Sequence, residues 1–159
     1  MTDPILITGG ATRLGFALTN YYLNHGQSVV ITYRSPRPQV EQLTDQGALC
    51  VQADFSTDDG VYAAAQELQD KCPVLNSIVH NASSWFTDPG GRQKLDHLAL
   101  MMRVHIGAPM VLTEMLAPAL LGSDNPSVIH VSDHVANRGS DQHMAYAASK
   151  SAMLNLTKS

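Results

Sequence analysis

The sequence predicts an α/β fold in which a parallel sheet is covered by helices on both faces. Short apolar runs rich in β-branched residues alternate with longer stretches whose apolar residues recur at helical spacing. Strands that alternate with helices need crossover connections, which are right-handed and place helices on both faces of the sheet. No repeat or low-complexity linker divides the chain, so we expect residues 1–159 to form a single domain.

The first part of the chain contains two strand–helix units. A β-branched-rich run at residues 4–8 predicts the first strand, and apolar residues at helical spacing from 14 to 23 predict the helix after it. Residues 28–33 are apolar on both faces, as a buried parallel strand is. A Ser-Pro-Arg-Pro segment ends this strand, and a short helix is expected at about residues 40–44.

The middle of the chain repeats the pattern. The third strand is expected at residues 48–52. The Ser-Thr-Asp-Asp segment at residues 56–59 supplies N-cap side chains for a helix that runs to about residue 71. Residues 76–80 predict the fourth strand, and a polar loop follows it.

The last part of the chain is predicted to be mostly helical. A long helical region is expected from about residue 94 to 121, the fifth strand at residues 127–132, and a last helix from about residue 143. Apolar spacing continues to the final residues without a glycine cap or a trailing proline. We therefore expect the fold to continue beyond this sequence.

Composition limits the class of partner. Hydrophobic residues make up 44% of the chain and charged residues 15%, which is typical of a globular protein and excludes a disordered or collagen-like chain. Ten Lys and Arg against fourteen Asp and Glu give a net charge of −4. Because no general positive field exists, we expect no nucleic-acid or membrane partner, and any bound anion must meet a local cluster of cations.

Cysteine and histidine usage points to a reducing compartment without a metal site. Cys50 and Cys72 have neither a disulfide framework nor a zinc spacing, and the seven histidines are scattered. We interpret both cysteines as buried free thiols. The first ten residues have no basic segment, and their apolar run is too short for a signal peptide or a membrane span. A cytoplasmic location is expected.

Chemistry is expected in the loops after the strands, because parallel sheets bind ligands at the carboxyl ends of their strands. The loop after the first strand reads TGGATRLG at residues 8–15. Glycines there allow a tight turn and let a diphosphate approach backbone amides at the start of a helix. Taken alone, the segment is a weak signal, and a plain strand-to-helix turn explains it better.

Two further segments make the pattern specific. NAS at residues 81–83 follows the fourth strand, and YAASK at 146–150 lies in the last helix. Together with the loop at residues 8–15, in this order, they resemble the short-chain dehydrogenase/reductase family over the whole chain. The resemblance implies a Rossmann-like, doubly wound sheet in three αβα layers that binds NADP(H), with the family's C-terminal strands absent from this sequence.

Departures from the family pattern point to one branch. Arg13 stands at the middle glycine of the loop, Ser83 at the last glycine of the Asn-Asn-Ala-Gly element, and Asp133 at the catalytic serine. Asp133 precedes Tyr146 by 13 residues, the interval usual for that serine. With the aromatic Trp85, these substitutions resemble the pteridine reductases. The resemblance implies reduction of a 7,8-dihydropterin, dihydromonapterin or dihydrofolate, to the tetrahydro form.

The end of the second strand predicts the cofactor. NAD-selective sites carry a carboxylate there, whereas this chain has Tyr33, Arg34 and Ser35. Arg34 and Arg13 can bind a 2′-phosphate, which favours NADPH, although both are also compatible with solvated surface arginines. Asp54 resembles the residue that contacts the adenine, or it caps a helix. The implied cofactor-binding residues are Thr8, Gly9, Arg13, Leu14, Gly15, Tyr33, Arg34, Ser35, Asp54, Phe55, Asn81, Ala82, Ser83, Tyr146 and Lys150.

The predicted catalytic residues are Tyr146, Lys150 and Asp133. Tyr146 and Lys150 are one helical turn apart, so we expect the lysine charge, beside the nicotinamide, to lower the pKa of the phenol. A carboxylate at Asp133 repels a developing oxyanion, which disfavours ketone reduction. We expect Asp133 to relay a proton toward a pterin nitrogen through Tyr146 or a water. The alternative is a structural Asp that caps the following turn.

The predicted substrate-binding residues are Ser83, Trp85, Asp133 and Tyr146. Trp85 is expected to stack on a flat pterin, or else to be a partly buried loop residue. Ser83 is expected to donate a hydrogen bond to the pterin or to a phosphate. His105 stands where the family has an asparagine that holds a water, and an ordinary helix histidine is equally compatible with this position.

Two other functions remain open at this stage. One is a generic NADPH-dependent carbonyl reductase, and the other is a nucleotide-binding fragment without catalysis. The resemblance also implies a homo-oligomer, a dimer or tetramer paired through the two long helices, if the chain is full length.

Overall fold

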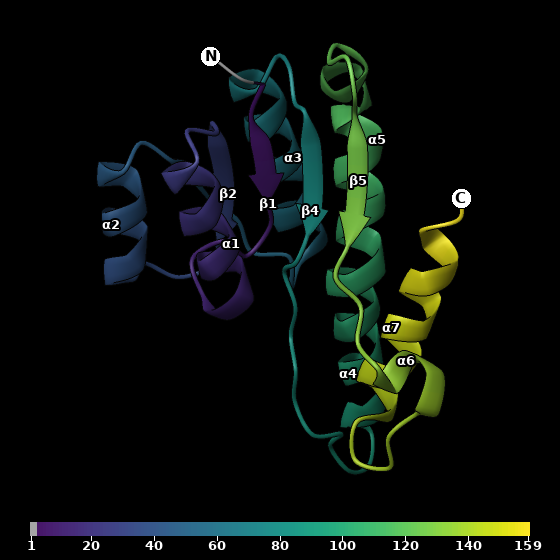
Figure 1. Cartoon of the computed structure of the whole chain (residues 1–159). Helices are drawn as coiled ribbons and strands as arrows, with labels where there is room; N and C mark the ends of the chain where they lie inside the picture. The colour runs from purple at the N-terminus through teal and green to yellow at the C-terminus, as the bar shows by residue number, and fades with distance from the viewer. Residues whose placement is uncertain (1–2) are drawn as a thin grey trace.

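A five-stranded parallel sheet forms the centre of the computed structural model, which describes residues 3–159 (Figure 1). The strand order is β3-β2-β1-β4-β5, so the order reverses between β1 and β4. Each strand lies within its predicted range, and the predicted parallel α/β fold is confirmed. The strands are β1 (Ile5–Ile7), β2 (Val29–Tyr33), β3 (Leu49–Gln52), β4 (Ser77–His80) and β5 (Ser127–His130).

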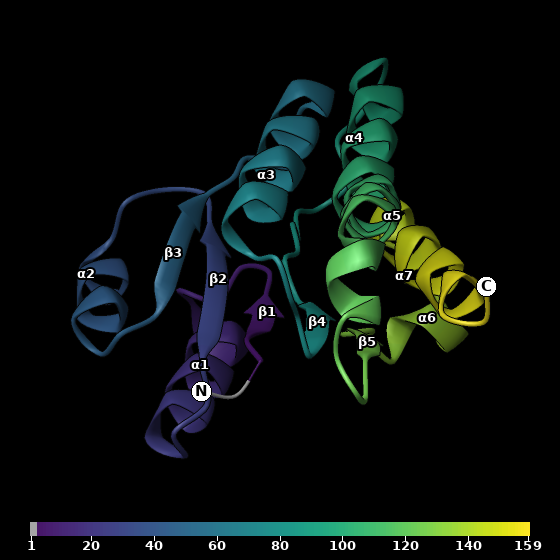
Figure 2. The same ribbon diagram turned by 90° about the horizontal axis from the view of Figure 1, so that it is seen from above.

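Helices cover both faces of the sheet and complete three layers. Alternate residues of a strand point to opposite layers: Leu6 packs in the cluster under α3 and α5, whereas the next residue, Ile7, packs in the cluster under α1 and α2. Figure 2 shows α1 and α3 on opposite sides of the strands. The four helices are α1 (Arg13–Asn24), α2 (Pro38–Asp45), α3 (Asp58–Lys71) and α5 (Ala108–Leu121).

The long predicted helix is present, but a wide turn interrupts it. α4 (Gln93–Met102) leads into a π-helical segment, η1 (Arg103–Gly107), which continues as α5. Residues 93–121 are long and apolar enough to span a membrane by length and composition alone, with a mean hydropathy of 1.5. Leu112 and Leu116 of this stretch are fully buried in the cluster with α3, and core helices of this kind meet the same criteria.

The last two helices lie beside this long stretch. α6 (Val135–Arg138) is a short helix in the segment predicted as a polar loop, and α7 (Met144–Leu156) begins where the last helix is expected. α7 packs against α4 and η1, and Figure 1 shows it on the far side of α5 from α3. The YAASK segment therefore lies against the wide turn of η1.

The start of α7 is capped by a residue that is distant in sequence. The helix's own N-cap residue, His143, makes no capping hydrogen bond with its side chain. Instead, the backbone amides of Met144 and Ala145 donate to the carboxylate of Asp88 in the loop between β4 and α4. The amide of Asp88 in turn donates to the carbonyl of Gln142 at 2.8 Å. These bonds hold the loop and the helix in a fixed relative position.

Replacing Asp88 tests this cap. Asp88→Ala removes both acceptors, so we expect it to lower the free energy of unfolding by about 1–2 kcal/mol in urea denaturation. Asp88→Asn keeps a capping oxygen and is expected to lose less than half as much. An unchanged urea midpoint for Asp88→Ala would show that the cap contributes nothing to stability.

Candidate active site

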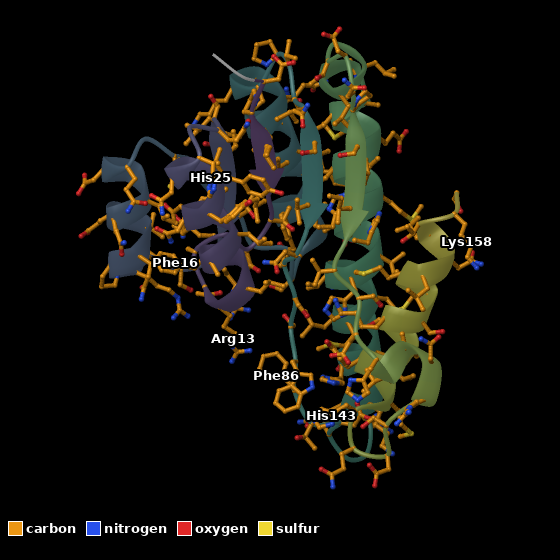
Figure 3. All side chains as sticks on the ribbon, in the orientation of Figure 1. Arg13, Phe16, His25, Phe86, His143 and Lys158 are labelled. Carbon is orange, nitrogen blue, oxygen red and sulfur yellow. The ribbon has the colours of Figure 1, made fainter. Side chains whose placement is uncertain are left out.

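A cavity of about 740 Å³ lies at the carboxyl ends of the strands, where ligands of doubly wound sheets bind. Figure 3 shows Arg13, Phe86 and His143 at this end of the molecule. Every predicted site residue lines the cavity except Thr8 and Gly15, which lie behind its wall. The lining also includes residues that the sequence did not single out, among them Arg37, Ser84, Phe86, Val104 and Ser132.

The loops after β1 and β4 are joined by a set of hydrogen bonds. The hydroxyl of Thr8 accepts from the backbone amides of Asn81 and Ala82, both at 2.9 Å. The side-chain amide of Asn81 donates to the carbonyls of Thr8 and Gly9, at 2.9 and 3.3 Å. Thr8 therefore supports the cavity wall from behind through its bonds to Asn81 and Ala82, which line the cavity.

The glycines allow α1 to approach this wall. Gly9 has a φ of +66°, which glycine adopts at little cost. A Cβ on Gly15 would lie 2.3 Å from the carbonyl oxygen of Gly9 and 2.6 Å from the amide nitrogen of Asn81, so only glycine fits. Thr12, the N-cap of α1, makes no side-chain capping bond and lines the cavity. The first amides of α1 and its positive end therefore face the cavity.

One end of the cavity is basic. Arg13, Arg34 and Arg37 line it together with Ser35, and all four are exposed. Arg37 belongs to the Ser-Pro-Arg-Pro segment, which the sequence showed only as a strand breaker. Its sequence signal is that it is a second arginine just after β2, three residues after Arg34. Three guanidinium groups around one end of a cavity favour an anion there.

Asp54 lies near this basic end, and the structure gives it a capping contact. Its carboxylate accepts from the amide of Ser56 at 2.9 Å. This bond, with a smaller influence of the Arg34 charge, lowers the pKa of Asp54 below its ordinary value. Contact of Asp54 with an adenine stays a prediction.

At the other end, the phenol of Tyr146 donates to a carboxylate oxygen of Asp133 at 2.9 Å. The tyrosine is 7% exposed. Burial, followed by the hydrogen bond and the charge of Asp133, raises the pKa of Tyr146 to about 12, against a smaller lowering by the nearby Ser83 hydroxyl. The expected lowering of the phenol pKa by Lys150 is therefore not found, because the carboxylate and burial both favour the neutral phenol.

Lys150 shares a face of α7 with Tyr146, as its spacing predicts. Its ammonium lies 5.7 Å from the centre of the Tyr146 ring and donates to the carbonyl of Val131 at 2.8 Å. Only 2% of the residue is exposed. Burial lowers the pKa of Lys150 to about 8, and the charge of Asp133 partly opposes this shift. At neutral pH the side chain is therefore mostly a buried cation.

Asp133 caps the following turn and also contacts Tyr146. One oxygen accepts from the amide of Val135 at 3.1 Å and caps the turn into α6, and His134 contacts the same oxygen at 2.8 Å. The other oxygen accepts from Tyr146. The hydrogen bond from Val135 is the main cause that lowers the pKa of Asp133, so the group is ionised at neutral pH. An ionised Asp133 holds no proton of its own to give, and its part in a proton relay stays a prediction.

Trp85 lines the cavity, and its ring is already stacked on one side. The indole lies against the His143 ring at a centroid distance of 4.5 Å and an interplanar angle of 10°. The residue is 57% exposed, and its neighbour Phe86, which the sequence did not single out, is 49% exposed. One aromatic face therefore remains for a flat ligand.

His105 is fully buried beside the site. Its Nε2 lies 2.9 Å from the hydroxyl of Ser83, and its Nδ1 lies 2.7 Å from the hydroxyl of Ser149. Burial and the charge of Lys150 lower the pKa of His105 to about 3. Within residues 3–159, no group of three or more His, Cys, Asp or Glu side chains is placed to hold a metal ion.

Comparison with known proteins gives a consistent picture. A family model for short chain dehydrogenases matches residues 3–159. The dihydromonapterin reductase of Citrobacter koseri is 47% identical over 158 residues, which are 98% of this chain and 66% of that protein. The chain thus spans 66% of the length of this curated relative.

Solved structures share the fold. Acetoin dehydrogenase YohF from Salmonella typhimurium superposes with a TM-score of 0.88 over 99% of this chain and 65% of its own, at 18% identity, which is a likeness of fold alone. The FolM alternative dihydrofolate reductase 1 from Brucella suis, solved in complex with NADP, has a TM-score of 0.83 and 29% identity over 97% of this chain and 66% of its own. With a family model matched over nearly all its residues, the chain belongs to the short-chain dehydrogenase family.

Proposed function

We propose that this chain is the nucleotide-binding and catalytic part of an NADPH-dependent reductase of 7,8-dihydropterins. The observation that carries the proposal is the hydrogen bond from the Tyr146 phenol to an ionised Asp133. A negative charge beside the proton donor disfavours a reaction that builds an oxyanion at this place, as ketone reduction does. Reduction of the C6=N5 bond of a dihydropterin adds a hydride to C6 and a proton to N5, and it builds no oxyanion.

The cavity fits NADPH. Gly9 and Gly15 let the start of α1 pack closely against the cavity wall, so that its first amides would face a diphosphate. Arg13, Arg34 and Arg37 would hold the 2′-phosphate, because no carboxylate stands at the end of β2 to select a free ribose hydroxyl. When bound, NADPH supplies the hydride. The FolM protein from Brucella suis, whose structure contains NADP, supports this cofactor.

Tyr146 would deliver the proton. Its pKa of about 12 keeps the phenol protonated across the physiological range. In the absence of ligand the hydroxyl donates to Asp133 at 2.9 Å, so the O–H would turn from Asp133 toward N5 before the proton is transferred. After transfer, the phenolate would regain a proton from solvent, and the Lys150 cation near the ring stabilises it meanwhile.

Lys150 would also bind the ribose of the cofactor, as the family resemblance implies. Its burial is unfavourable for folding, because the pKa of about 8 lies below the ordinary value of 10.5. The site therefore retains a cation that the fold alone does not favour, which is typical of functional groups.

The pterin would bind against the exposed aromatic residues of the loop after β4. Trp85 offers one face and Phe86 lies next to it. Flat heteroaromatic rings stack well on such side chains. The dihydromonapterin reductase of Citrobacter koseri, 47% identical to this chain, supports a pterin as substrate.

We further propose self-association through α4 and α7. Leu95, Leu98 and Met144 are exposed along a groove of about 280 Å³ between these helices. Exposed apolar side chains on neighbouring helices favour burial against a second copy. Of these helices, α7 also holds Tyr146 and Lys150, so pairing would also stabilise the site.

The substrate is tested by assay of the protein with NADPH and three compounds: dihydromonapterin, dihydrofolate and a simple diketone. We expect turnover of a dihydropterin and little of the diketone. Tyr146→Phe removes only the transferable proton, so we expect kcat to fall by about 10²-fold or more with little change in NADPH affinity. Ready reduction of the diketone without any of the pterins would show a generic carbonyl reductase instead.

The cofactor preference is tested at Arg34. Arg34→Ala is expected to weaken NADPH binding by about 2 kcal/mol, the scale of one charge-assisted contact, and to leave NADH binding nearly unchanged. Fluorescence titration of the reduced cofactors measures both. Arg92→Ala, an exposed arginine outside the cavity, is the matched control. Equal losses for the two cofactors would remove the assignment of the 2′-phosphate.

The burial of Lys150 predicts a pH-dependent stability. The folded-state pKa of about 8 is below the unfolded value of 10.5, so the buried ammonium destabilises the fold below pH 8. This loss is relieved as the pH rises from 8 to 10.5. Lys150→Met should therefore raise the free energy of unfolding at pH 7 by about 1–3 kcal/mol, and the gain should shrink toward pH 10.

Urea denaturation of the parent and of Lys150→Met at both pH values measures the gain. Lys158→Met, at an exposed position near the end of α7, is the control and is expected to change little. A gain that is independent of pH, or a loss at pH 7, contradicts the assigned pKa.

A further inference from the structure

His105 joins the loop after β4 to α7 through its two ring nitrogens. Its Nε2 contacts Ser83 and Ser84 of the loop, and its Nδ1 contacts Ser149 of α7. We propose that His105 is a positioning residue that accepts a hydrogen bond from the Ser83 hydroxyl, so that Ser83 meets the substrate as a hydrogen-bond acceptor. This inference rests on the proposed pterin reductase function and identifies which kind of substrate atom Ser83 binds.

The surrounding hydrogen bonds determine the tautomer of the ring. The backbone amide of Ser84 donates to Nε2 at 3.2 Å, so Nε2 carries no proton. A neutral imidazole then has its proton on Nδ1, which donates to the hydroxyl of Ser149 at 2.7 Å. The Ser149 hydroxyl in turn donates a hydrogen bond to the backbone carbonyl of Tyr146 at 2.7 Å. In this series of hydrogen bonds, the Ser84 amide, the Nδ1–H of His105 and the Ser149 hydroxyl each donate to one acceptor.

The environment keeps the ring neutral. His105 is fully buried, and the Lys150 cation acts on it. Both effects lower the pKa of His105 to about 3, so a second proton is not bound at neutral pH. The lone pair on Nε2 is therefore shared by two donors, the Ser84 amide at 3.2 Å and the Ser83 hydroxyl, whose oxygen is closer at 2.9 Å.

The consequence concerns the cavity side of Ser83. The residue is exposed to the cavity, and a hydroxyl has one proton and two acceptor lone pairs. Because the proton points to His105, only lone pairs are offered to a ligand. Ser83 therefore pairs with an N–H of the substrate, and the expectation that it donates to the pterin or to a phosphate is replaced. Pterins carry an amino group and ring N–H groups of the required kind.

The wide turn of η1 positions the ring for this task. His105 is the central residue of the five-residue π-helical segment and is packed edge-on against Tyr146, with ring centroids 5.4 Å apart and an interplanar angle of 82°. Wide turns of this kind are frequent at functional sites. The imidazole is thus held between the loop and α7 on both nitrogens and on its ring edge.

Two substitutions of His105 by amide residues test the roles of its two ring nitrogens separately. In His105→Gln the amide oxygen reaches the place of Nε2 and keeps an acceptor for Ser83. In His105→Asn the shorter amide reaches only the place of Nδ1 and keeps the Ser149 end. A purely structural histidine would make both variants equivalent for the ligand. A positioning role for Ser83 makes His105→Asn the weaker binder.

Ligand binding without turnover is measured by quenching of Trp85, the single tryptophan of the chain, with dihydromonapterin in the presence of NADP⁺. We expect Ser83→Ala to weaken the pterin Kd about tenfold, the loss of one hydrogen bond. His105→Asn should weaken it by about the same factor or somewhat less, and His105→Gln by less than about threefold. In Ser83→Ala/His105→Asn the loss should equal that of Ser83→Ala alone, because the histidine acts only through the serine.

Losses that multiply in the double variant, or a His105→Gln variant as weak as His105→Asn, would overturn the inference. NADP⁺ affinity and urea unfolding of each variant separate a local effect from misfolding. Should His105→Asn fail to fold, the comparison of His105→Gln with Ser83→Ala still decides.

A second measurement does not depend on any pterin. Long-range ¹H–¹⁵N NMR spectra of the uniformly labelled parent protein report the His105 tautomer at pH 7, with assignment by comparison with His105→Gln. We expect a neutral ring protonated on Nδ1, and a ring protonated on Nε2 overturns the inference. If the parent binds no dihydropterin but the Nδ1 tautomer is observed, the proposed substrate fails and the acceptor state of Ser83 stands.

Discussion

The hydrogen bonds between Thr8 and Asn81 are the constraint on which the site depends. They join the loops after β1 and β4 at the place where the strand order reverses. At such a place the two crossovers leave in opposite directions, and the loops would separate without a direct connection. The Thr8 hydroxyl accepts two backbone amides of the loop after β4, so the backbone that carries Ser83 and Trp85 follows the glycine loop closely. Cofactor and substrate surfaces are thereby held on one support.

Electrostatics in the cavity is set by opposing effects on neighbouring groups. Asp133 stays charged because a backbone amide and Tyr146 donate to it, and this same charge keeps the tyrosine protonated. Lys150 is buried with a weakened preference for its charged form, and its cation acts on His105 to keep that ring neutral. The charge of each group thus helps to set the protonation state of its neighbour, and a change in one group alters the pKa of the others.

Much of the fold and of the cavity lining could be predicted from the sequence, because strand and helix periodicity and the positions of loops are local properties. The protonation states of the site residues could not be predicted in this way. The spacing of Tyr146 and Lys150 shows that they share a helix face, but it does not show that burial and the charge of Asp133 raise the pKa of the phenol. The wide turn at His105 and the cap from Asp88 were also missed, since helical periodicity does not reveal one five-residue turn or a partner 56 residues away.

The loop after β4 is attached to α7 at both of its ends, and this decides how the site can select a ligand. Near its start, His105 links Ser83 to the helix, and farther along, Asp88 caps the first turn while His143 stacks on Trp85. A loop held in this way loses little conformational entropy when a ligand binds. The position of the aromatic face relative to the Tyr146 phenol is therefore set before binding. Selectivity then follows from which flat molecule places its acceptor nitrogen at the phenol and its N–H at the serine, because the site does not reshape itself around another geometry.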